Sequence, residues 1–153
     1  MIQTLFTSKE HPPNWNEINR FMPDYAKHGV YVWGSIVYNP KGFNIDPSLA
    51  KRCEQISAMQ YEYGGDKFLY KIMPKKRIQD WWSRYLRDKA FWLAMELPAC
   101  QKQYWEIENV IKNKAKLEKF AELLAKDLAK EGLISLGQAI KAITSKSLIK
   151  FKI

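Results

Sequence analysis

A helix marked at both ends is the feature that most constrains the fold of this chain. Asp46 and Pro47 form a helix start signal, because aspartate is a favoured N-cap and proline is tolerated at the first helical position. Gly64 and Gly65 form a stop signal. The sequence therefore predicts one helix over residues 47 to 63.

Three side chains on this helix lie close enough together to form a chemical site. Cys53 and Ser57 are four residues apart, so they point to the same side of a helix, and Glu54 is adjacent to that side. Zinc peptidases of the H-E-x-x-H type carry their catalytic glutamate at this place between two histidines. The spacing is kept here, but both histidines are absent.

The rest of the chain predicts extended segments near the N-terminus and helices after them. The stretch GVYVWGSIVYNPKG, residues 29–42, is rich in β-branched and aromatic residues, with a central glycine and a closing Asn-Pro-Lys-Gly turn. It predicts a hairpin or one bent edge strand, and residues 1–6 predict a short strand. Later in the chain, helix starts are expected at Asp88 and Ser135, and an apolar stripe at helical spacing covers residues 117–128. Together these segments indicate an α+β, mainly helical fold.

The amount of apolar sequence is enough for one domain. Of the 153 residues, 46% are hydrophobic and 14% aromatic, so burial can offset the loss of chain entropy. We expect a single domain over residues 1–153, with a basic tail at about 144–153.

The net charge of +9 is compatible with an acidic partner, whether nucleic acid, an anionic membrane surface or an acidic protein. The lysines are also scattered through helical segments, which is typical of a solvated basic surface. If the charge serves binding, the candidate binding residues are Lys75, Lys76, Arg77, Arg84 and Arg87.

Cysteine usage and hydropathy indicate the expected environment. Cys53 and Cys100 are the only cysteines, and the first residues show no signal peptide. No stretch approaches about 18 uninterrupted apolar residues. We therefore expect an intracellular, reduced setting, no disulfide, no transmembrane helix and no membrane partner.

Several separated motifs occur in a recognisable order. They are GVYVWGSIVYNPKG, then CEQISAMQ, then WWSRYLRDKAFWLAMELPACQKQY, and last LAKDLAKEGLISLGQAIKAI. This order resembles the zinc metallopeptidases predicted in bacteriophages and prophages, in which a Tyr-Asn-Pro turn precedes an H-E-x-x-H-x-x-Q helix. A W-W-x-x-Y-L segment running into a Glu-Leu-x-Ala helix follows in that family. The similarity covers roughly residues 30 to 143 and implies zincin-like helices.

The resemblance implies roles for individual residues. Glu54 matches the general base, and Gln60 matches the glutamine after the second histidine. Glu96 matches the glutamate expected as the third ligand. The two histidine positions fall on Cys53 and Ser57, so this chain departs from the family at the metal ligands.

Ligand chemistry makes this departure severe. A catalytic zinc site usually has three protein ligands and a bound water. Cysteine thiolate is a good zinc ligand and neutral serine is a poor one, so Cys53 and Glu96 alone remain. Recruitment of His11 or His28 would complete the set, and His28, just ahead of the extended segment, is the better placed. The inserted segment KFLYKIMPKK is expected to enlarge or cover the region above the cleft and to add positive charge.

Three functions remain as hypotheses. The first is a catalytically degenerate phage metallopeptidase-like protein without a cofactor. It would be a structural or interaction component with phage or other proteins as partners, in the virion or host cytoplasm. The second is an active zinc peptidase with Cys53, Glu96 and a further ligand, and with Glu54 as base. The third is a basic module that binds nucleic acid or an acidic protein surface. We favour the first, because the loss of ligands is direct and net charge is only permissive.

Overall fold

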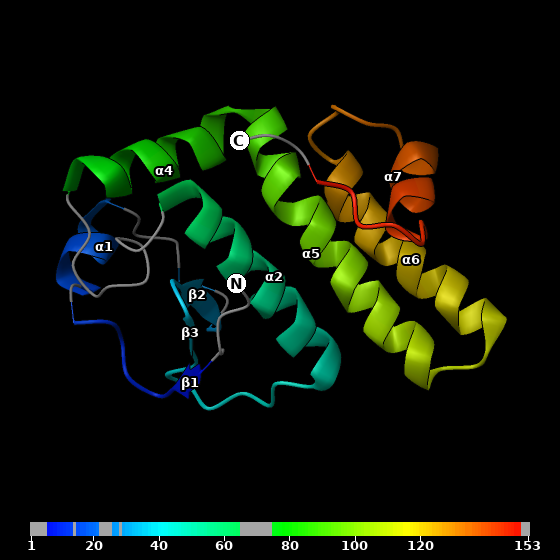
Figure 1. Cartoon of the computed structure of the whole chain (residues 1–153), viewed down its shortest axis with the longest axis horizontal. Helices are drawn as coiled ribbons and strands as arrows, with labels where there is room; N and C mark the ends of the chain where they lie inside the picture. Colours follow the sequence, from blue (N-terminus) through cyan, green and yellow to red (C-terminus); the bar gives the residue numbers. More distant parts are fainter. Residues whose placement is uncertain (1–5, 14, 22–25, 28, 65–74, 151–153) are drawn as a thin grey trace. The chain divides into compact units, whose positions relative to one another are not determined.

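The computed structural model describes residues 6–13, 15–21, 26–27, 29–64 and 75–150. These residues are mainly helical and include a small three-stranded sheet near the N-terminus (Figure 1). The predicted α+β, mainly helical class is therefore confirmed.

The chain divides into two compact units. The sheet unit consists of residues 1–45 and 56–87, and the helical unit consists of residues 46–55 and 88–153. The expectation of a single domain stays a prediction.

The sheet unit contains the short strands β1 (Phe6–Ser8), β2 (Tyr31–Trp33) and β3 (Ile36–Tyr38), in the order β1-β3-β2. β1 runs parallel to β3, and β2 runs antiparallel to β3. The helices α1 (Trp15–Phe21) and α4 (Lys75–Arg87) belong to the same unit and contact each other.

A glycine turn joins β2 to β3. Gly34 has a φ of +65°. Ser35 has a negative φ, because only glycines have a positive φ in the described part of the chain. This combination defines a type II′ turn, whose twist matches that of the two strands. Of the two predicted alternatives, the structure therefore confirms the hairpin. The expected turn after β3 also forms, closed by the Gly42 N–H donating to the Asn39 carbonyl at 3.0 Å.

Helix α2 (Pro47–Gly64) confirms the helix framed by the two sequence signals. Asp46 Oδ1 accepts hydrogen bonds from the Ser48 hydroxyl at 2.6 Å and from the Leu49 N–H at 2.9 Å. Both bonds lower the pKa of Asp46, and the bond from Ser48 has the larger effect. They also stabilise the helix start.

The helical unit contains α5 (Lys89–Val110), α6 (Lys114–Ala129) and α7 (Leu136–Ile143). Asp88 accepts from the Phe91 N–H at 3.1 Å, and Ser135 forms a capping box with Gln138, so both predicted caps are confirmed. Asn113 caps α6 in the same way.

Apolar residues from these three helices form one buried cluster, and the predicted stripe of α6 supplies its centre. Removal of a large member such as Leu128 is expected to cost about 2–5 kcal/mol of stability. The buried residues of the cluster are Leu93, Leu97, Cys100, Tyr104, Ala121, Leu124, Ala125, Leu128, Ala139 and Ile143.

A buried glutamine on α5 holds the segment that follows α7. Gln101 Nε2 donates to the carbonyls of Ala142 at 2.9 Å and Ser147 at 3.0 Å, while Gln101 Oε1 accepts from the Ile149 N–H at 2.8 Å. The part of the predicted basic tail that the structure describes therefore has a defined path over α5 (Figure 1).

Within the ranges that the structure describes, no helix combines the length and the apolar character needed to cross a bilayer.

Candidate functional site

Helix α2 carries the predicted site residues in the expected helical phase. Cys53 and Ser57 are both buried, one turn apart on the same helix, and Gln60 is fully buried. Glu54 is different, since its side chain is 43% exposed and lies 3.9 Å from the Lys51 ammonium. Glu54 is therefore a surface carboxylate in this structure. An exposed ion pair of this kind contributes little to stability.

Ser57 and Gln60 hold the hairpin turn. The Ser57 hydroxyl donates to the Gly34 carbonyl at 2.5 Å, and Gln60 Oε1 accepts from the Gly34 N–H at 2.8 Å. Both backbone polar groups of the turn glycine are thus bonded to α2. A buried backbone group without a partner would cost about 1–3 kcal/mol, so these contacts are structurally important.

The second amide atom of Gln60 bonds to β2 itself. Gln60 Nε2 donates to the Val32 carbonyl at 2.9 Å. Val32 lies opposite Val37, and in a hairpin with a two-residue turn this pair is not hydrogen-bonded, so the Val32 carbonyl points away from β3. The glutamine that matches the family motif therefore serves as a backbone clamp for the hairpin.

Burial disfavours the ionised form of Cys53. Burial raises its pKa to about 11, although the charge of Arg52 acts in the opposite direction. Burial thus favours the neutral thiol over the thiolate, which is the form that binds zinc. Burial likewise raises the pKa of Cys100, to about 12.

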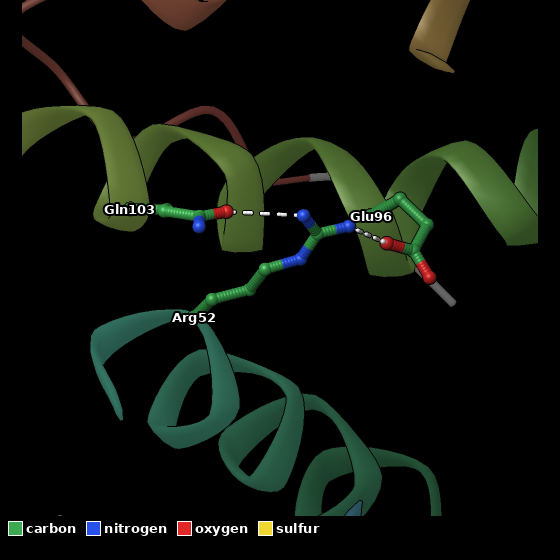
Figure 2. A network of polar contacts seen from close by, with 3 residues as sticks. All are labelled: Arg52, Glu96 and Gln103. Carbon is green, nitrogen blue, oxygen red and sulfur yellow. Dashed lines mark hydrogen bonds and ion pairs between the residues drawn. The ribbon is translucent and has the colours of Figure 1, made fainter. Parts of the chain in front are cut away.

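Glu96 on α5 is bound by an arginine of α2. Arg52 Nη2 lies 3.0 Å from Glu96 Oε2, and Arg52 Nη1 donates to Gln103 Oε1 at 3.0 Å, as Figure 2 shows. The Glu96 side chain is only 13% exposed and that of Arg52 24% exposed. The carboxylate that the resemblance assigns to zinc is therefore already neutralised by a guanidinium in a mostly buried position.

The residues at the family's metal positions do not fit a zinc ion in this structure. The Ser57 hydroxyl donates to a carbonyl, burial disfavours the ionised form of Cys53, and Glu96 is paired with arginine. Over the part of the chain that the structure describes, no three or more histidine, cysteine and acidic side chains are grouped so as to hold a metal ion.

Of the two histidines considered as replacement metal ligands, His11 lies in the described part of the structure and His28 does not. The His11 ring stacks on Trp15 with ring centroids 4.3 Å apart, and its Nδ1 lies 2.5 Å from the Tyr31 hydroxyl oxygen. His11 is thus engaged in an aromatic cluster of the sheet unit. His28 and most of the KFLYKIMPKK segment lie outside the described residues.

The predicted basic residues fall on α4. Lys75, Lys76 and Arg77 form its first turn, and their side chains lie outside the described part of the structure. Arg84 and Arg87 lie in the last turn, where Arg84 is partly buried and Arg87 is exposed.

The sequence analysis did not identify Arg52 and Gln101, whose side chains make long-range hydrogen bonds in the helical unit. Arg52 stands directly before the candidate ligand Cys53, and Gln101 stands directly after Cys100. A charged or amide residue inside an otherwise buried helix face was the signal available for both.

No known protein family model matches this chain, and no curated protein or solved structure does so either. The resemblance to phage metallopeptidases therefore stays a prediction.

Proposed function

We propose that this chain is a catalytically degenerate, metallopeptidase-like protein that acts as an interaction component, with other proteins of a phage assembly as its partners. Its former active-site helix has a structural use. The phage setting rests on the sequence resemblance, and the loss of catalysis is supported by the contacts of α2.

One observation carries the proposal. The position of the second histidine is occupied by Ser57, whose hydroxyl donates to the Gly34 carbonyl at 2.5 Å in a buried setting. A hydroxyl that serves as a donor to a carbonyl is not offered to a metal ion. The neighbouring Gln60 bonds to the same glycine, so this part of α2 stabilises the hairpin.

A second contact supports the same proposal in the helical unit. Metal binding by Glu96 would require its carboxylate to leave the Arg52 guanidinium, which would then lose this partner in a mostly buried position. The loss of a hydrogen bond to a charged group in such a position costs about 1.5–3 kcal/mol. The Arg52–Glu96 pair therefore opposes zinc binding.

Metal content tests the proposal directly. We expect the purified protein to contain far less than one zinc per chain after dialysis against trace zinc, measured by plasma mass spectrometry. Stoichiometric zinc that disappears in Cys53→Ala would overturn the proposal and support the zinc peptidase with altered ligands.

A restored variant provides the matched comparison. Cys53→His with Ser57→His rebuilds the histidine pair of the family motif. Zinc gained by this variant alone, at a stoichiometric level, indicates a peptidase scaffold that has lost its ligands. Because Arg52 holds Glu96, a folded variant that gains no zinc counts against the family assignment only when Arg52→Met is added to release that carboxylate.

Peptidase activity is the second measurement. The proposal predicts no metal-dependent cleavage of a mixed peptide library, before or after the addition of zinc. Cleavage that is lost in Glu54→Gln and retained in Lys51→Gln would show that Glu54 is a working general base.

A further inference from the structure

The segment that follows α7 crosses α5 without forming a helix or a strand. This segment, residues 145–150, is here called the strap, and Figure 1 shows its path. Leu148 and Ile149 are partly buried, and the other residues after Ser145 are exposed. Both α5 and the strap belong to the helical unit. The contacts between them show what kind of ligand this place on α5 accepts.

Gln101 of α5 pairs with the backbone of the strap. This residue is fully buried. Its Nε2 donates to the Ser147 carbonyl at 3.0 Å, and its Oε1 accepts from the Ile149 N–H at 2.8 Å. These two backbone groups stand on either side of Leu148. Because every peptide carries such groups, except at the nitrogen of proline, the Gln101 amide is suited to bind a peptide backbone.

Trp105 adds a second contact to the same backbone. Its Nε1 donates to the Ser145 carbonyl at 3.0 Å. Gln101 and Trp105 are four residues apart on α5, so they share one side of the helix. Together the two side chains bond to backbone groups at both ends of residues 145–149.

The strap itself carries two features that fit it to α5. The Ser145 hydroxyl donates to the Ser147 carbonyl at 3.2 Å and accepts from the Ser147 N–H at 3.3 Å, which bends the chain at Lys146. The Ile149 side chain packs against the buried cluster of the helical unit. A serine bend followed by an aliphatic side chain is therefore the pattern that this place accepts.

We propose that Gln101 and Trp105 form a peptide site, which the strap fills in the free chain, and that a segment of a partner protein displaces the strap from it. The segment has the chemistry of the strap, a serine bend followed by an aliphatic residue in the place of Ile149. This inference deepens the interaction role proposed above and rests on it for the kind of partner.

The strap can leave the peptide site while the helices stay folded. It is joined to α5 by side-chain hydrogen bonds and by the packing of Ile149. Irregular segments held in this way open locally at a lower cost than the helices beneath them. Opening takes away the bonds that the strap makes to Gln101 and Trp105, and the backbone of an incoming segment restores them.

A partner protein is favoured over a second copy of this chain by the balance of these bonds. The strap of a second copy would have to leave its own Gln101 and Trp105, so it would lose the bonds that it gains. A partner segment that is not already bound elsewhere has no such loss. The strap of the same chain competes with it at an effective concentration in the millimolar range and so lowers the apparent affinity.

Fluorescence anisotropy with a labelled peptide tests the proposal. The peptide has the sequence of residues 144–150, Thr-Ser-Lys-Ser-Leu-Ile-Lys. It is titrated with the full chain and with Ile149→Asp, which loosens the chain's own strap because a carboxylate is costly against the apolar cluster. Gln101→Leu is then added to Ile149→Asp, and Gln138→Leu, a glutamine of the α7 cap, is added in a matched control. Far-ultraviolet circular dichroism establishes that the variants are folded.

We expect Ile149→Asp to bind the peptide about tenfold or more tightly than the parent, because its site is open. Adding Gln101→Leu should weaken this binding about tenfold or more, whereas adding Gln138→Leu should change it by less than about twofold. A change in the peptide gives the same answer without altering the protein. Methylation of the backbone nitrogen of its isoleucine removes the donor to Gln101 and should weaken binding more than methylation at its leucine.

Three results would overturn the proposal. The first is no saturable binding by Ile149→Asp at up to about 1 mM peptide. The second is equal binding with and without Gln101→Leu, together with equal effects of the two methylated peptides. The third is a dimer of the parent, measured by light scattering, that Gln101→Leu abolishes, since a second copy would then be the occupant. None of these measurements involves a metal or α2, so their failure is distinct from a failure of the proposed loss of catalysis.

Discussion

The Ser57 hydroxyl donates a hydrogen bond to the Gly34 carbonyl at 2.5 Å, and this contact joins the middle of α2 to the tip of the β2–β3 hairpin. The glycine is required there because its φ is +65°, in the left-handed region that other residues rarely adopt. A helix position at which the family motif has a metal ligand is thus used here to hold a glycine turn. Histidine at position 57 would lack this hydroxyl, so Ser57→His is expected to weaken the hold of α2 on the turn.

Gln60→Leu should destabilise the sheet unit. Leucine has a similar volume, but it leaves the Gly34 N–H and the Val32 carbonyl without the bonds that they make to Gln60. We expect a loss of about 2–4 kcal/mol in the free energy of unfolding, measured by urea denaturation. Gln138→Leu, which removes the exposed bond from the Ser135 N–H to Gln138 Oε1, serves as comparison and should cost about 1 kcal/mol. Equal losses in the two variants would contradict a clamp at Gln60.

Arg52 and Glu96 should show strong energetic coupling. Arg52→Met leaves a mostly buried carboxylate without its counterion, and Glu96→Gln keeps the shape of the side chain while removing its charge. We expect Arg52→Met to cost about 1.5–3 kcal/mol alone and clearly less in the Glu96→Gln background. A double-mutant cycle in urea gives the coupling free energy, and a value near zero would show that the pair contributes nothing.

The two buried thiols should make the chain less stable in alkali. Burial raises the pKa of Cys53 from 9.0 to about 11 and that of Cys100 to about 12, so the folded chain keeps protons that the unfolded chain releases. Their contribution is complete below about pH 9 and is lost as the pH rises from about 9 to about 12. The limiting slope is about 1.4 kcal/mol per pH unit and thiol.

Unfolding free energies measured between pH 8 and about pH 11 check this. A variant with Cys53→Ala and Cys100→Ala should show a shallower decline than the parent, although it starts from a lower stability. Tyrosines titrate in both proteins and cancel in the comparison. Parallel curves for the two proteins would mean that burial does not raise the pKa values of the two thiols.

Gln101→Leu should release the segment after α7. The change removes the bonds from Gln101 to Ala142, Ser147 and Ile149 while keeping most of the buried volume. We expect trypsin to cleave at Lys146 about tenfold faster or more, because local opening controls access to the protease. Mass spectrometry identifies the product, and Lys146→Gln in the same background should abolish it. An unchanged cleavage rate would show that the apolar contacts of this segment hold it without Gln101.

Local signals made much of the fold predictable. The caps at Asp46, Asp88 and Ser135 and the glycine turn at Gly34 depend on residues close in sequence, and the structure contains all of them. These features follow from backbone geometry and short-range hydrogen bonding, which a single sequence displays directly.

The contacts of the candidate site were not predictable in the same way. Arg52 meets Glu96 across 44 residues, and Gln60 meets Gly34 across 26. Their spacing in sequence does not say which side chain of one helix faces which residue of another element. Glu96 therefore fitted a ligand role in the sequence, and nothing in the sequence showed that Arg52, next to Cys53, is its partner.

The bond from Gln60 to the Val32 carbonyl also bears on how the protein behaves at high concentration. β2 is an outer strand of its sheet, and outer strands with open carbonyls can recruit strands from other molecules and start aggregation. The amide of Gln60 occupies one of these carbonyls from the side that an incoming strand would use. Through this bond α2 covers one carbonyl of the outer strand, which is expected to hinder the pairing of β2 with a strand of another molecule.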